Sequence, residues 1–501
     1  MTHRELLLGD EALALGALHA GLSGVYAYPG TPSTEITEYI QGSALAKERG
    51  VHCLWSTNEK TAMEEALGMS FAGKRALVCM KHVGMNVAAD AFVNSGMTGA
   101  NGGLVVVAAD DPSMHSSQNE QDSRFYGKFS FIPVFEPSSQ QEAYEMVQEA
   151  FEFSERHGIP VLMRLTTRMA HSRAVVEVRE PKAQNELHYP AQTRQWVLMP
   201  GNSRNRYKKL LEEYAACERE AVESRFNPCT EGSDTSMGII ACGIGYNYLM
   251  ENYPDGCPYP VLKISQYPVP AEQIRHMAEK CRSLLVIEEG QPLVEESLRG
   301  ILPAQLPIRG RMTGELPRTG ELTPDCVRAA LGLPPLEAHA ASEIVVPRPP
   351  ALCQGCGHRD MYTALKEVVE EFDHAKVFSD IGCYTLGWLA PFHAIDTCVD
   401  MGASITMAKG AADAGQHPSI AVIGDSTFTH SGMTGLLDAV NEKSPITIII
   451  SDNLTTGMTG GQDSAGTGRL EQICAGIGVE PEHIRVMVPL PRNHEEMKRI
   501  I

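Results

Sequence analysis

The stretch IAVIGDSTFTHSGMTGLLDAVNEKSPITIIISDNLTT, residues 420–456, contains two apolar runs of the length of buried strands, separated by a segment of helical character. The first run leads into Asp425 and the second into Asn453. Strand, helix and strand in this order predict two neighbouring strands of a parallel sheet. Because such strands end at the same edge, we expect Asp425 and Asn453 to lie close together.

Both side chains carry hard oxygen ligands of the kind that Mg²⁺ prefers. The turn Gly424-Asp425-Ser426 opens a helix, and the N–H groups at a helix N-terminus favour a phosphate group. A Gly-Asp-Ser turn by itself is more often only a strand-to-helix connection. The glycine-rich run GMTGGQDSAGTG at 457–468, which follows Asn453, favours a site for Mg²⁺ and a diphosphate.

Similar alternation of short apolar strands and helical segments extends over most of the 501 residues. This pattern is typical of α/β proteins in which helices cover parallel sheets. We predict three such units, at 1–185, 236–340 and 341–501, and a charged helical linker at 186–235. Residues 1–22 are expected to begin the chain as a helix. In the third unit we expect four strands: AKVFSDIG, SIAVIGDS, PITIIISDN and HIRVMVP.

The sequence has 62 acidic and 42 basic residues, so the net charge is −20. Without a basic block, this balance argues against nucleic acid or an anionic membrane as a partner. No window reaches the ~18 uncharged apolar residues of a membrane-spanning helix, and no basic segment typical of a targeting signal precedes the N-terminal apolar residues. We therefore expect a cytoplasmic protein with no membrane segment.

The thirteen cysteines fall into two groups. Cys353-x-x-Cys356 is followed by Cys383 at the end of a predicted strand, and in an intracellular chain a CxxC pair indicates metal or redox chemistry rather than a structural disulfide. Most of the others lie in apolar runs and are expected to be buried thiols; these include Cys53, Cys79, Cys242 and Cys281.

The Gly424-Asp425-Ser426 to Asn453 pattern resembles the diphosphate and Mg²⁺ motif of thiamine diphosphate enzymes, with Ser426 in place of the motif's second glycine. Other segments are similar to the alpha subunits of indolepyruvate ferredoxin oxidoreductases, a family of 2-oxoacid:ferredoxin oxidoreductases. These segments are YPGTPSTEI (28–36), WSTNEKTAMEEALG (55–68), MKHVGMNVAAD (80–90), DDPSMHSSQNEQDSR (110–124), CQGCGHR (353–359), DIGCYTLG (380–387) and DNLTTGMTGGQ (452–462).

The resemblance implies a role for each residue that matches a motif. Asp425 and Asn453 would bind Mg²⁺ through their side chains and Thr455 through its backbone carbonyl. Glu59 would hydrogen-bond to the pyrimidine ring and activate the cofactor, although a glutamate at a helix start is also an ordinary partner of the helix dipole. Around the cofactor, the resemblance places Gly424, Ser426, Gly457, Met458 and, near the reacting centre, Thr31.

Two weaker candidates lie in a loop at the same sheet edge as Glu59. A 2-oxoacid carboxylate needs a cationic or hydrogen-bonding partner, and Lys81 and His82 follow the apolar strand ALVCM. Loop lysines and histidines are more often solvated than bound to a ligand.

Related ferredoxin oxidoreductases hold a [4Fe–4S] cluster near thiamine with cysteines arranged like Cys353, Cys356 and Cys383. A fourth ligand would come from Cys398 or Cys474. Zinc, or no metal at all, are the alternatives.

For the whole chain, the resemblance implies two thiamine-binding domains, for the pyrimidine and the diphosphate, with a transketolase C-terminal-like domain between them. It implies oxidative decarboxylation of aryl 2-oxoacids such as indolepyruvate to acyl-CoA, with ferredoxin as electron acceptor and a beta subunit in a heterodimer or heterotetramer. Alternatives are a non-oxidative thiamine-dependent decarboxylase or carboligase, and a non-enzymatic thiamine-binding scaffold. The CxxCxxCxxxCP runs of the family's usual C-terminal ferredoxin-like domain do not occur in the sequence, so we expect a truncated form or electron transfer through a separate protein.

Overall fold

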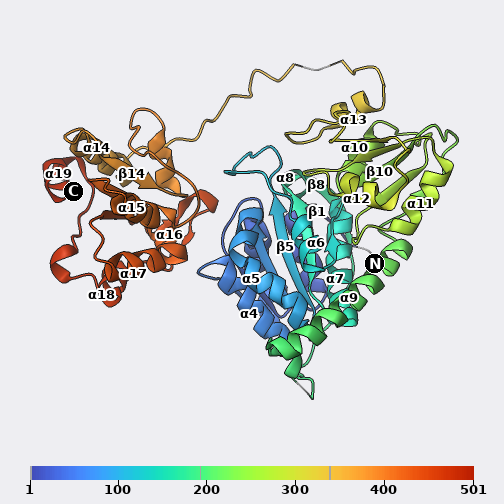
Figure 1. Ribbon diagram of the computed structural model, residues 1–501, viewed down its shortest axis with the longest axis horizontal. Coiled ribbons are helices and arrows are strands. Elements are labelled where there is room, and N and C mark those ends of the chain that lie inside the picture. The colour runs from blue at the N-terminus through green and yellow to red at the C-terminus, as the bar shows by residue number, and fades with distance from the viewer. Residues whose placement is uncertain (1–2, 192, 338–339) are drawn as a thin grey trace. The chain divides into compact units, whose positions relative to one another are not determined.

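The computed structural model describes residues 3–191, 193–337 and 340–501, and the chain divides into two compact units, Met1–Ala338 and His339–Ile501 (Figure 1). The first unit contains a six-stranded sheet, a five-stranded sheet and a two-stranded ribbon. The second contains a three-stranded sheet and a short hairpin. No helix among the described residues has the length and apolar character needed to span a bilayer.

The six-stranded sheet is entirely parallel, which confirms the α/β prediction. Its order is β3 (His52–Trp55), β2 (Gly24–Ala27), β4 (Ala76–Lys81), β5 (Leu104–Asp110), β7 (Val161–Thr166) and β6 (Val134–Phe135). The central strands are buried on both faces, as near-continuous apolar runs require.

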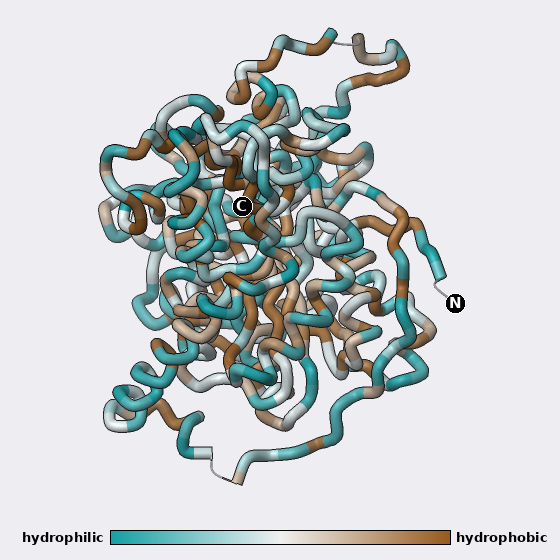
Figure 2. Tube along the Cα trace, turned by 90° about the vertical axis from the view of Figure 1, so that its right-hand side faces the viewer, coloured by the Kyte–Doolittle hydropathy of each residue, from teal (hydrophilic) through white to brown (hydrophobic). Residues whose placement is uncertain are grey.

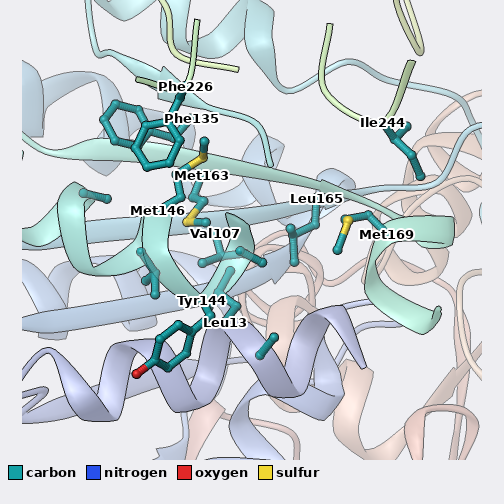
Figure 3. Close-up of a cluster of buried hydrophobic side chains, with 14 of the residues drawn as sticks. Leu13, Val107, Phe135, Tyr144, Met146, Met163, Leu165, Met169, Phe226 and Ile244 are labelled. Atoms are coloured by element: carbon teal, nitrogen blue, oxygen red, sulfur yellow. The ribbon is translucent and has the colours of Figure 1, made fainter. Parts of the chain in front are cut away.

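Helices cover both faces of this sheet. On one face, Leu13, Tyr144 and Met146 pack with Val107 and Met163 in one buried cluster (Figure 3). The helices on that face are α1 (Gly9–His19), α2 (Thr34–Gly42), α3 (Ala44–Glu48) and α7 (Gln140–His157). On the other face lie α4 (Glu59–Phe71) and α5 (His82–Thr98), side by side next to β5 in Figure 1.

The N-terminal prediction is wrong for its first residues. His3–Leu8 forms β1, which pairs antiparallel with β8 (Arg173–Val178), and α1 begins only at Gly9. Leu6 is 63% exposed and Leu7 is 4% exposed, an alternation that fits a strand rather than a helix. The pairing partner lies about 170 residues away in the sequence, so local pattern alone did not reveal it.

After β8, a 3₁₀ turn (Arg194–Trp196) and α9 (Pro200–Glu223) lead to the five-stranded sheet. Its short edge strand β9 (Cys229–Thr230) runs antiparallel and falls in the segment for which we expected no strand. The sheet order is β13 (Ile308–Arg309), β12 (Leu284–Ile287), β10 (Gly238–Cys242), β11 (Val261–Ile264) and β9, and the surrounding helices are α10 (Gly245–Glu251), α11 (Ala271–Lys280), α12 (Leu293–Ile301) and α13 (Pro324–Ala330).

Buried arginines join the two large sheets of the first unit. Arg164 of β7 donates to Asp110 at 2.5 Å, to Glu136, and to the Glu289 carbonyl oxygen at 3.1 Å; Glu289 follows strand β12 of the second sheet. Arg124, the first residue of α6 (Arg124–Ser130), donates to the same carbonyl. All of these side chains are almost fully buried.

Asp122 shows the electrostatic balance of this network. Burial alone would raise the pKa of its carboxyl, but Arg124 and Arg164 lower that pKa to about 2. The guanidinium groups of Arg124 and Arg164 therefore favour the ionised form of Asp122, although this carboxyl is shielded from water.

In the second unit, β14 (Lys376–Ser379), β15 (Ser419–Gly424) and β16 (Thr447–Ser451) form a parallel sheet in that order. The predicted fourth strand, HIRVMVP at 483–489, is wrong: after a 3₁₀ turn at Pro481–His483 the segment is irregular. Val486 and Val488 alternate as a strand would, but they are exposed and pair with no neighbour among the described strands. The helices are α14 (Gly357–Val369), α15 (Ala403–Asp413), α16 (Asp425–Thr427), a π-helical turn (Phe428–Gly432), α17 (Met433–Asn441), α18 (Leu470–Ile477) and α19 (His494–Ile500).

Residues 340–351 form no helix or strand and run as extended chain (Figure 1), as a segment rich in proline should. Cys79, Cys242 and Cys281 are buried as predicted, while Cys53 is only half-buried. Along the trace, the long hydrophobic stretches lie in the interior and the polar residues on the outer turns (Figure 2).

Replacing Arg164 by methionine should lower the free energy of unfolding by about 3–5 kcal/mol, because Asp110 and Glu136 would remain buried without their cation. The control is Arg168→Met: Arg168 pairs with Glu321 and is 40% exposed, so about 1 kcal/mol or less should be lost. Urea denaturation followed by circular dichroism measures both, and equal losses would contradict the assignment.

Candidate active site

The second unit brings together the residues that follow β15 and β16. Gly424 and Ser451 are paired at the ends of these parallel strands, so Asp425 and Asn453 emerge at one edge. One terminal atom of the Asn453 amide lies 3.0 Å from Asp425 Oδ1 and 2.8 Å from the Thr455 carbonyl oxygen. The two side chains and this carbonyl therefore converge on one point.

The chemistry of that point depends on which amide atom faces it. With nitrogen there, Asn453 would donate to both oxygens; with oxygen there, three oxygens face one another, which is favourable only around a cation. Neighbouring oxygen ligands of octahedral Mg²⁺, bound at about 2.1 Å, lie about 3.0 Å apart. The distances at Asp425, Asn453 and Thr455 match that spacing and also that of amide hydrogen bonds. With the amide oxygen turned inward, this donor set can bind Mg²⁺.

Asp425 itself shows the same need for a cation. Asp425 is only 2% exposed, and its Oδ2 has no hydrogen-bond partner among the described residues. Burial raises the pKa of its carboxyl, and the nearby Asp452 raises it further. A divalent ion would stabilise the ionised form of Asp425.

The glycine-rich run folds back over Asp425. Strand β17 (Thr455–Thr456), directly before the run, pairs with β18 (Gln462–Asp463) within it, and Thr456 Oγ1 donates to Ser426 Oγ at 2.9 Å. A β-carbon at Gly466 would lie 3.4 Å from the Asp425 carbonyl oxygen. Met458, in the 3₁₀ turn Gly457–Thr459, is 56% exposed.

Asp380, which follows β14 at the same edge, received no role from the sequence. Its Oδ2 accepts hydrogen bonds from Ser404 N at 3.1 Å and Ser404 Oγ at 2.6 Å, and Tyr384 donates to Oδ1. Burial raises the pKa of this carboxyl to about 6. Its position directly after a strand could have marked Asp380 as a site residue. Its hydrogen-bond partner Ser404 could not be identified from the sequence, because it lies 24 residues away.

The three candidate cluster cysteines lie in the same unit. Cys353 is exposed, and Cys356 and Cys383 are half-buried. Cys356 Sγ lies 3.1 Å from His358 Nδ1, and a β-carbon at Gly457 would lie 3.1 Å from Cys383 Sγ. Burial raises the pKa of the Cys383 thiol, and the other two thiols add to this effect. Cys383 therefore lies beside the glycine-rich run, while the metal-cluster role of the three thiols stays a prediction.

In the first unit, Glu59 is the first residue of α4, after β3. The Asn58 side chain caps this helix by accepting from Thr61 N at 2.9 Å. Glu59 is 5% exposed, and its carboxyl packs against α5, where a β-carbon at Gly84 would lie 2.7 Å from Glu59 Oε1. Only glycine at position 84 leaves room for the carboxyl.

Thr31, Lys81 and His82 lie at the carboxyl edge of the same sheet. A β-carbon at Gly30 would lie 3.0 Å from Lys81 Cβ, so the loop that contains Thr31 lies against Lys81. Lys81 Nζ donates to the Ser116 carbonyl oxygen at 2.6 Å, and burial lowers its pKa.

His82 differs from Lys81 because it is completely buried. Its Nε2 lies 3.2 Å from both the carbonyl and the side-chain oxygen of Asn119. His82 therefore holds the loop of residues 113–121 over the sheet edge. The other ring nitrogen of His82, Nδ1, has no hydrogen-bond partner among the described residues.

The sequence as a whole matches proteins of one family. Indolepyruvate oxidoreductase subunit IorA of Archaeoglobus fulgidus is 40% identical over 99% of this chain and 85% of its own length. The chain belongs to the IorA family. The subunit of the same name from Methanothermobacter thermautotrophicus is 37% identical over 99% of this chain and 84% of its own length.

Two domain models and one solved structure agree with this membership. The model "Pyruvate flavodoxin/ferredoxin oxidoreductase, thiamine diP-bdg" matches residues 15–221, and "Thiamine pyrophosphate enzyme, C-terminal TPP binding domain" matches residues 380–482. A 2-oxoglutarate:ferredoxin oxidoreductase from Magnetococcus marinus superposes with a TM-score of 0.53 at 16% identity, covering 66% of this chain and 65% of that chain. This likeness confirms the fold.

Asp425→Asn should weaken the metal site, because it removes the charged ligand while leaving the shape. We expect the Mg²⁺ concentration for half-maximal binding of thiamine diphosphate to rise at least about tenfold. Titration of protein fluorescence with Mg²⁺ at constant cofactor measures this. The matched control is Asp438→Asn, an exposed aspartate of α17; if both variants respond alike, Asp425 is not a ligand.

Proposed function

We propose that this chain is the catalytic alpha subunit of an indolepyruvate:ferredoxin oxidoreductase, which converts aryl 2-oxoacids to acyl-CoA by oxidative decarboxylation with ferredoxin as electron acceptor. The observation that carries the proposal is the convergence of the Asp425 and Asn453 side chains with the Thr455 carbonyl oxygen, in a chain 40% identical to a subunit of that name. The domains proposed are 1–185 for the pyrimidine, 236–340 as transketolase C-terminal-like and 341–501 for the diphosphate, with a linker at 186–235.

In this proposal the second unit holds the charged end of the cofactor. Thiamine diphosphate, when bound, supplies a carbon nucleophile for the 2-oxoacid carbonyl and accepts the electrons left by decarboxylation. Asp425, Asn453 and Thr455 would hold Mg²⁺ against the diphosphate. Gly424 and Ser426 lie in the turn whose N–H groups would bind a phosphate, and Gly457 leaves space beside Cys383.

The first unit would supply activation and substrate binding. A buried carboxyl such as Glu59 makes a strong hydrogen bond to a pyrimidine nitrogen because no water competes for it. Lys81, with a pKa lowered by burial, can pair with a substrate carboxylate, and Thr31 lies in the adjoining loop. His82 is assigned to the same site through the loop that it holds. Met458 is the candidate from the second unit for bordering the substrate.

The remaining parts of the proposal concern electron transfer. Cys353, Cys356 and Cys383 are proposed to bind a [4Fe–4S] cluster with a fourth ligand, and a beta subunit and ferredoxin to complete the enzyme; all relatives named above are described as subunits. None of the thirteen cysteines, all of which lie among the described residues, forms a disulfide; this supports a reducing compartment, and we propose the cytoplasm.

Substrate turnover and iron content test the function together. Anaerobically purified chain with its beta subunit should contain iron and should oxidise indolepyruvate faster than phenylpyruvate, pyruvate or 2-oxoglutarate, with CoA and ferredoxin or a viologen. Protein without iron that releases aldehyde would instead be a non-oxidative decarboxylase. Replacing Cys353 and Cys356 by serine should remove the iron, and Cys217→Ser, at a buried cysteine of α9, is the control.

Glu59 can be tested by substitution and by displacement. Glu59→Gln should lower kcat about 10²-fold or more with little change in cofactor binding. Gly84→Ala should also lower kcat, because its β-carbon occupies the space of the Glu59 carboxyl. Gly68→Ala on α4 meets nothing within 4 Å and should retain full activity; unchanged turnover in Glu59→Gln would refute the assignment.

A further inference from the structure

A separate group of ligand atoms lies at the N-terminal end of α1, formed by residues that have no role in the proposed reaction. Asp10 of α1, Glu35 of α2 and His171, the last residue of α8 (Thr167–His171), each offer one ligand atom, and these atoms lie within 4.8 Å of one another. Across residues 3–191, 193–337 and 340–501, this is the one trio of His, Cys, Asp or Glu residues whose ligand atoms come this close together.

Asp10 is the member that needs explanation. It is completely buried, and among the described residues neither of its carboxylate oxygens has a hydrogen-bond partner. An ionised carboxylate in the interior without a partner costs several kcal/mol. Burial, and then the neighbouring Glu35 and Glu11, raise the pKa of Asp10. A buried carboxyl group needs a hydrogen-bonding partner or a cation, and the described residues supply neither to Asp10.

The backbone holds Asp10 and His171 next to each other. Leu8 pairs with Arg173 at the end of the β1–β8 ribbon, and Asp10 and His171 each lie two residues beyond that pair. Their proximity is therefore determined by strand register rather than by flexible side chains.

Gly9 strengthens this arrangement. Its N–H donates to the Ser172 carbonyl oxygen at 3.2 Å, and a β-carbon at this position would lie 1.9 Å from the Met169 carbonyl oxygen. No other residue type could bring α1 so close to α8. The position of Asp10 is thus fixed by a contact between main chains.

Glu35 and His171 complete the group from the solvent side. Glu35 Oε1 lies 3.3 Å from His171 Nε2, and the two side chains are 36% and 35% exposed. Ligand atoms bound at about 2.1 Å to one metal ion lie about 3.0 Å apart in octahedral and about 3.4 Å apart in tetrahedral geometry. The 3.3 Å spacing fits, and the partial exposure provides an entry path to Asp10.

We propose that Asp10, Glu35 and His171 bind a first-row divalent transition-metal ion, separate from the Mg²⁺ of the cofactor. Two carboxylates and a neutral imidazole carry a charge of −2, which a divalent ion neutralises. The imidazole favours Mn²⁺, Fe²⁺, Co²⁺ or Zn²⁺ over Mg²⁺. The ion joins the first turns of α1 and α2 to the end of α8, and so stabilises the first unit.

Cobalt binding to the full-length protein tests the site. With Mg²⁺ and thiamine diphosphate present in excess, protein is dialysed against Co²⁺, and bound cobalt is measured by elemental analysis and by its visible absorption. Asp10→Asn and His171→Gln should each bind one equivalent less than the wild type. His3→Gln, at an exposed histidine beside Glu5, should bind as much as the wild type.

Thermal denaturation provides a readout that does not depend on activity. Co²⁺ should raise the melting temperature of the wild type but not of Asp10→Asn, which keeps the shape of the side chain without its charge. His171→Gln changes a partly exposed side chain and serves if Asp10→Asn does not fold. Equal cobalt content in the wild type and both variants would overturn the proposal, and Asp10 would then be a protonated acid. The proposal would also fail if the cobalt missing from the variants shows, in the wild type, the charge-transfer absorption of a cobalt–thiolate bond.

Discussion

A carboxylate that leaves water needs a positive partner, and this requirement governs the molecule at three places. Between the two large sheets of the first unit, Asp110 pairs with Arg164, and Asp122 pairs with both Arg164 and Arg124. In the second unit, Asp425 lies at the proposed Mg²⁺ site through Oδ1, and its Oδ2 lacks a hydrogen-bond partner among the described residues. At the start of α1, neither carboxylate oxygen of Asp10 has a hydrogen-bond partner within the part of the chain that the structure describes. The same physical problem is thus met by arginine in the framework and, as we propose, by metal ions at the other two sites.

The overall charge of −20 gives these local cations further importance. A diphosphate, a 2-oxoacid and CoA are all anions, and the acidic sequence contains no basic block that could attract them. In the proposed site, positive potential would come from the helix N-terminus at Ser426, from Lys81 and from a bound ion. Asp452, next to the metal site, shows the cost of the acidic composition, because it raises the pKa of Asp425.

Glycines set the geometry of two sites through close approach rather than flexibility. Gly84 leaves the space that the Glu59 carboxyl occupies, and Gly9 lets α1 touch the backbone of α8. Gly84 of α5 makes space for a side chain of α4, whereas Gly9 of α1 lets the main chains of α1 and α8 approach each other. A glycine of this kind is recognised only when both elements are placed, because nothing in its own neighbourhood requires it.

The sequence by itself determined the parallel α/β class, the edge at which Asp425 and Asn453 meet, and the family, because these depend on apolar runs and motifs that are local in the chain. Only the tertiary structure decided that His3–Leu8 is a strand and that 483–489 is not, since a strand needs a partner that local pattern does not supply. It alone also revealed the partners of Asp380 and the grouping of Asp10, Glu35 and His171. Those residues are far apart in sequence, and hydrogen bonding and metal binding depend on distance in space.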